Sequence, residues 1–67
     1  MNDEALNASI RKFLKTVGVN SQIKIEKAVR EAAEAGTLKS GSIPAKMTLV
    51  IDDLSIDVEF DGELDLG

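Results

Sequence analysis

Five carboxylates recur at every second position near the C-terminus of the chain, at Asp57, Glu59, Asp61, Glu63 and Asp65. Acidic side chains at this spacing project from one face of an extended strand. They could bind a basic protein surface, coordinate a cation or, if a pocket shifted their pKa values, transfer protons. We take these five acids as the candidate partner-binding residues.

The same acids, together with Gly62, resemble the beginning of a calcium-binding loop. In such a loop the twelfth position is a Glu that binds the ion with both oxygens, and a helix follows. Counted from Asp57, the twelfth position lies beyond Gly67. The chain also contains no Cys and no His, so the common zinc and iron ligand sets are excluded. The sequence therefore predicts no metal and no cofactor.

Side chains for catalysis are equally scarce. The chain lacks His, Cys, Tyr and Trp, its Ser and Thr residues have no evident base beside them, and no Gly-rich phosphate loop is present. A chain of 67 residues also has too small a core to enclose a pocket that shifts the pKa of a carboxylate. We expect that the protein is not an enzyme.

A second candidate surface is basic. Residues 1–46 contain all eight Lys and Arg residues against five acids, whereas residues 47–67 contain seven acids and no base. If two helices presented their cations together, nucleic acid could bind there. The cations concerned are Arg11, Lys12, Lys15, Lys24 and Lys27, with Arg30 beside them. The pI near 4.6 argues against this alternative, which ranks behind a protein partner.

Two amphipathic helices are expected at the start of the chain. Apolar residues recur at steps of three and four from Leu6 to Val17, and again from Ile25 to Ala33. Gly18 is typical of a helix C-terminus, and the next residues include Asn and Ser, which favour a new N-terminus. The pattern predicts helices over about 3–17 and 21–35, followed by a loop over 36–44.

Strict alternation of apolar and polar residues predicts two strands, over about 45–51 and 54–66. Asp52 and Asp53 then form a two-residue turn between them. In this register Lys46 lies opposite Glu59. A four-residue turn would keep the same two faces, so the assignment of faces is independent of the turn.

The second strand is too long to be straight. Residues 54–66 would span about 43 Å, so we expect a bend or break at Asp61-Gly62. The predicted fold is α+β in one small domain, 1–67: two antiparallel helices packed on a C-terminal antiparallel hairpin or short three-stranded meander, in the order α-α-β-β. An unpaired strand end could pair with a second copy, giving a homodimer through the C-terminal strand edge.

Three blocks of the sequence resemble a family of small bacterial proteins of unknown function. They are Ser9–Val19, then Ser21-Gln22 with Ile25–Ala32, and Met47-Thr48-Leu49. The resemblance implies a short bacterial protein with helices before strands, and it brings no activity, ligand or functional residue.

The remaining expectations concern location and function. No apolar run approaches the ~18 residues of a membrane span, the N-terminus is acidic, and Cys is absent, so we expect a cytoplasmic protein without a membrane partner. Function stays unknown at this point. The leading hypothesis is a protein-interaction or regulatory module with an unidentified protein partner, and the alternative is a nucleic-acid-binding protein that uses the helical Lys and Arg residues.

Overall fold

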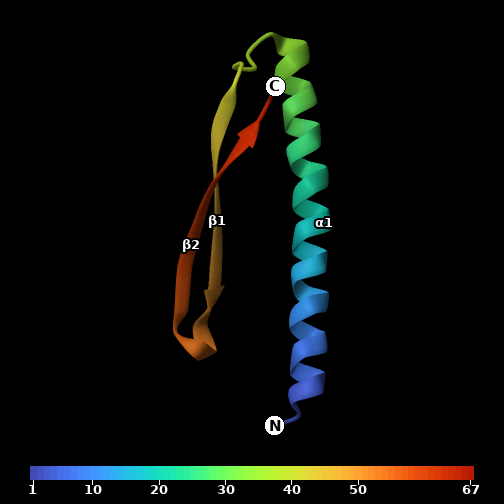
Figure 1. Ribbon diagram of the computed structural model, residues 1–67, viewed down its shortest axis with the longest axis vertical. Coiled ribbons are helices and arrows are strands. Elements are labelled where there is room, and N and C mark those ends of the chain that lie inside the picture. Colours follow the sequence, from blue (N-terminus) through green and yellow to red (C-terminus); the bar gives the residue numbers. More distant parts are fainter.

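One long helix and one β-hairpin make up the protein (Figure 1). The computed structural model describes residues 1–67, with helix α1 at Asp3–Ala35, strand β1 at Ser42–Ile51, a 3₁₀ turn η1 at Asp52–Leu54 and strand β2 at Ile56–Asp65. The strands form a two-stranded antiparallel sheet. The predicted order α-α-β-β is therefore wrong, because the order is α-β-β.

Gly18 does not end the first helix. It lacks the positive φ of Gly36, which does end one. The helix continues because the apolar side keeps its phase across the glycine: Val17, Ser21 and Ile25 follow one another at steps of four. A glycine inside a helix costs about 1 kcal/mol relative to Ala, which does not break a helix of 33 residues. The two predicted helices, about 3–17 and 21–35, are one element.

The outer ends of the predicted helices are confirmed. Asn2 is the N-cap, and its Oδ1 accepts a hydrogen bond from the backbone N–H of Ala5 at 3.1 Å. Gly36 is the C-cap with φ 72°, and its N–H donates to the carbonyl of Ala33 at 3.2 Å. This left-handed residue lets the chain turn back along the helix.

The hairpin has a longer connection than expected. Ile51 pairs with Ile56, so residues 52–55 form a four-residue turn and the predicted two-residue turn is wrong. Gly62 pairs with Ala45 inside the ladder, so β2 neither bends into a meander nor breaks. The predicted faces are confirmed. One face carries only apolar residues and Gly62: Ile43, Ala45, Met47, Leu49, Ile51, Ile56, Val58, Phe60, Gly62 and Leu64.

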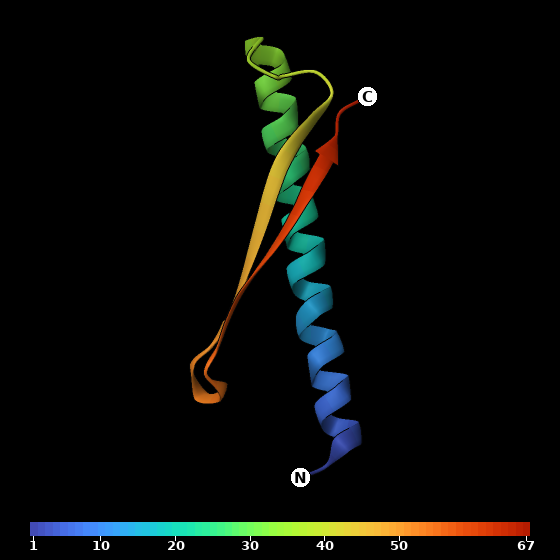
Figure 2. The same cartoon turned by 60° about the vertical axis from the view of Figure 1, so that its left-hand side comes forward.

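The molecule is extended and has no enclosed core. Its radius of gyration is 15.9 Å, against about 11 Å for a compact chain of this length. No residue is buried, and the accessible surface is 5995 Å², against about 4,100 Å² for a typical monomer of this mass. Figure 1 and Figure 2 show, from two directions, that the tip of the hairpin stands apart from α1.

Candidate functional site

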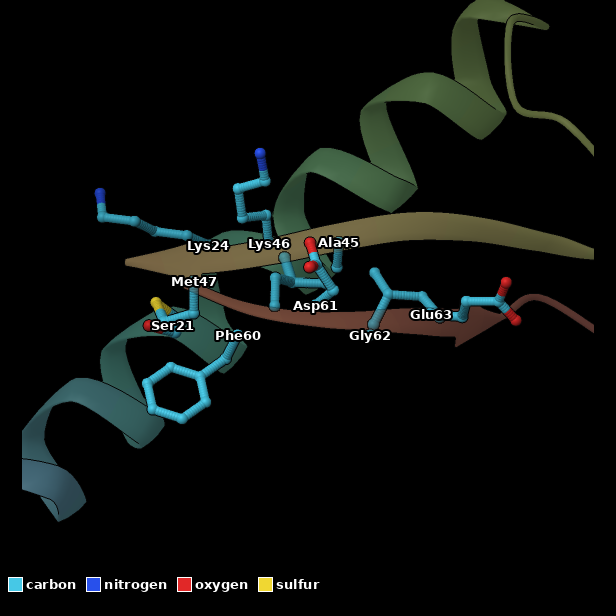
Figure 3. Close-up of a pocket in the computed structure, with 11 residues that line it drawn as sticks. Ser21, Lys24, Ala45, Lys46, Met47, Phe60, Asp61, Gly62 and Glu63 are labelled. Carbon is cyan, nitrogen blue, oxygen red and sulfur yellow. The ribbon is translucent and has the colours of Figure 1, made fainter. Parts of the chain in front are cut away.

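A groove lies between the middle of α1 and the hairpin (Figure 3). Its volume is about 620 Å³. Ser21 and Ile25 line it from the helix, and Met47 and Phe60, which pair across the two strands, line it from the sheet. In Figure 3 the ammonium ends of Lys24 and Lys46 point away from Met47 and Phe60, so the charges lie at the rim of the groove.

A smaller cavity marks the end where helix and hairpin meet. Its volume is about 210 Å³, and all seven lining residues are hydrophobic. They are Ile25, Ala28, Val29, Ala32, Leu38, Ile43 and Leu64. Several of these, such as Val29, Ile43 and Leu64, are half-buried, whereas Met47, Val58 and Phe60 farther along the hairpin are exposed. The helix therefore covers the hairpin best beside the loop.

The exposed residues on the facing sides of the two elements form what we call the open apolar surface. It consists of Leu6, Ile10, Phe13 and Leu14 of α1 and Met47, Val58 and Phe60 of the hairpin, each 41–58% exposed. On the helix these residues continue the side on which Val17 and Ser21 are half-buried. The open apolar surface thus extends the helix–hairpin contact into solvent.

The predicted acidic residues share one face of β2, as expected from their spacing. Asp57, Glu59, Asp61, Glu63 and Asp65 lie on the face of the hairpin opposite the apolar residues. One cation, Lys46, lies on the same face and forms an ion pair there, with its Nζ 3.5 Å from Oε2 of Glu59. No group of three or more His, Cys, Asp or Glu side chains is placed to hold a metal ion. Partner binding by this face stays a prediction.

The predicted basic residues do not converge. Arg11 and Lys27 are about 24 Å apart along one straight helix, at 1.5 Å per residue. Lys12 and Lys15 lie on the side of α1 away from Ile10, whereas Lys24 lies at the rim of the groove. Lys27 is 4.0 Å from Glu31, and Arg30 is 3.5 Å from Glu26. The nucleic-acid hypothesis required two helices to bring these cations together, and a single helix does not.

Sequence reasoning missed the open apolar surface because it assigned these residues to a core. The signal was present in the spacing. Leu14, Val17, Ser21 and Ile25 keep one helical phase through Gly18, which indicates one helix too long for a short hairpin to cover.

The helix α1, which is the only α-helix, is not apolar enough over any membrane-spanning length to cross a bilayer.

Comparisons with known proteins add one finding to this geometry. Searches of curated proteins and of solved structures found no match to the chain. The model of a family of unknown function, DUF6494, matches residues 1–67, and the chain belongs to this family.

Proposed function

We propose that the protein is a non-catalytic interaction module that binds a protein partner through the open apolar surface. The observation that carries this proposal is the absence of any buried residue beside the open apolar surface, which holds seven of the thirteen exposed large hydrophobic side chains. A contiguous apolar surface that is exposed to water usually marks an interaction site, because covering apolar side chains removes them from water and is favourable. The partner then supplies the cover that the hairpin does not.

The groove supports binding rather than catalysis. Its floor is formed by Ile25, Met47 and Phe60, which offer contact area and no proton donor or nucleophile. The charged residues Lys24 and Asp61 also line the groove, and Lys24 points away from the floor. Polar groups around an apolar centre are the usual arrangement of a protein interface.

The acidic face of β2 has a second role in this proposal. It lies opposite the apolar face of the same two strands, so it stays in solvent when the open apolar surface is covered. Its charges keep the outer side of the hairpin soluble and, lying outside the contact, act on the rate of encounter with a partner. Reversing Asp57, Glu59 and Asp61 to Lys is therefore expected to change the association rate more than the affinity of the complex.

The test compares two substitutions in α1. Leu14 is 55% exposed within the open apolar surface, and Ile23 is 58% exposed on the other side of the helix. The tagged chain of residues 1–67 and its Leu14→Asp and Ile23→Asp variants are used as bait in native lysate, with and without nuclease. We expect the same protein on wild type and Ile23→Asp, and its loss on Leu14→Asp. Retention by Leu14→Asp, or loss after nuclease treatment, would contradict the proposal, and the second result would favour the basic residues.

We also propose that the protein works in the cytoplasm. The absence of cysteine supports this location, because it fits a reducing compartment. Fractionation of cells with an antibody against the chain would test it.

A further inference from the structure

We infer that the partner on the open apolar surface is a second copy of this chain. This inference rests on the proposed function, because it names the occupant of the same surface. Three features of the chain fit a second copy: the area left exposed, the matching of its two apolar arms and the absence of charged side chains from the surfaces that would meet.

The exposed area is that of half an obligate homodimer. The accessible surface of 5995 Å² exceeds that of a typical monomer of this mass by about 1,900 Å². A standard transient complex covers about 800 Å² on each partner, which would leave more than half of this excess in water. Obligate homodimers bury between about 2,000 and 5,000 Å² in total, and removing the excess from two copies falls within that range.

The two arms of the chain can cover each other in a symmetric pair. The helical arm exposes Leu6, Ile10 and Leu14, and the hairpin arm exposes Val58 and Phe60. In a two-fold arrangement the helical arm of one copy lies on the hairpin arm of the other, and the second contact repeats the first. Both exposed arms are then covered in each copy, and a helix packed on a sheet is a stable layer arrangement.

Charge does not oppose this contact. The apolar face of the hairpin contains no ionisable side chain, and neither do the helix positions of the open apolar surface. These side chains themselves can therefore be covered without taking a charged group out of water, which would be costly. Lys12 and Lys15 lie on the other side of α1, and the acids lie on the other face of β2.

Charge does oppose the strand-edge dimer considered from the sequence. Antiparallel pairing of β2 with its own copy, in any register that keeps the apolar residues on one face, would set acidic residues of one strand opposite those of the other, because acids occupy every second position. On the other edge, Pro44 of β1 has no N–H to donate. The face of the molecule is thus a better site for a second copy than either edge.

The first experiment measures mass in solution by sedimentation across a hundredfold range of concentration. We expect wild type and Ile23→Asp at twice the 7.2 kDa chain mass, and Leu14→Asp at the monomer mass. The two positions are nine residues apart, about 180° around the helix, so the substitutions differ in face and not in exposure. Wild type at 7.2 kDa throughout would overturn the inference. An equal effect of both substitutions would also overturn it.

A second measurement needs no substitution, so a variant that unfolds cannot mislead it. Wild-type chain labelled with ¹³C is mixed with unlabelled chain, refolded together and examined for nuclear Overhauser effects between copies. We expect contacts from the methyl groups of Ile10 and Leu14 to the ring of Phe60. Their absence in a sample of dimer mass would overturn this inference. A monomer that still captures another protein through Leu14 would overturn it and leave the proposed function intact, whereas a monomer that captures nothing would overturn both.

Discussion

The ammonium group of Lys46 lies 3.5 Å from Oε2 of Glu59, although the residue directly opposite Lys46 in the hairpin is Asp61. Diagonal neighbours on a sheet are within reach of long side chains, and Glu is longer than Asp by one methylene. Lys46 is the only base on a face that carries five acids. Its position therefore relieves repulsion among the acids as well as forming one pair.

This diagonal pair predicts which acid is coupled to Lys46. In double-mutant cycles, Lys46→Ala with Glu59→Ala should show a coupling of about 0.5 kcal/mol, because both side chains are exposed. Lys46→Ala with Asp61→Ala should show a smaller one. Urea unfolding at fixed protein concentration measures both. A larger coupling to Asp61 would mean that the direct pair dominates in solution.

The sequence predicted a pairing of Lys46 with Glu59 from the wrong register. Alternation shows which residues share a face of the sheet, because the face depends only on whether a position is odd or even. The predicted faces are therefore correct although the register is not. Register depends on the turn, and the turn depends on the left-handed conformation of Ser55, with φ 54°. Nothing in the alternation of β1 and β2 specifies that conformation.

The open apolar surface could not be predicted from the sequence for a different reason. Sequence identifies Leu6, Ile10 and Leu14 as apolar residues on one side of a helix, but it does not show what covers them. Local signals at Gly18 and Ser21 favoured a break that would have folded a second helix over them. Whether a glycine ends a helix depends on the phase of apolar residues on both sides, and here the phase is continuous.

Two glycines with opposite roles test the continuous helix. Gly18→Ala should stabilise the protein by about 1 kcal/mol, because the position is helical and a Cβ there meets nothing within 4 Å. Gly36→Ala should destabilise it by about 1 kcal/mol, because φ is 72°. Thermal and urea unfolding measure both changes. If Gly18 were a turn residue, both substitutions would destabilise.

Ser55 is the only residue other than glycine with a positive φ. Because a side chain is strained in this conformation, Ser55→Gly should stabilise the hairpin by roughly 1 kcal/mol, offset in part by the flexibility of glycine in the unfolded chain. Ser55→Val should destabilise it, since a β-branched side chain tolerates the left-handed region poorly. Unfolding curves of the three proteins check the order. Equal stability of the Gly and Val variants would exclude a left-handed residue at this turn.

The crowding of acids on β2 predicts that single carboxylates differ in their effect on stability. Asp57 lies opposite Val50 and gains no attraction across the strands, whereas Asp61 lies opposite Lys46. Asp57→Thr should stabilise the protein by about 0.5 kcal/mol, because Thr favours strands and packs against Val50. Asp61→Thr is the matched control and should give a smaller gain, because it also removes a charge attracted by Lys46.

Unfolding at low and high salt separates the contribution of charge repulsion from that of strand preference. Repulsion is screened by salt and strand preference is not, so the gain from Asp57→Thr should shrink in high salt without disappearing. A larger gain from Asp61→Thr would contradict the observed register.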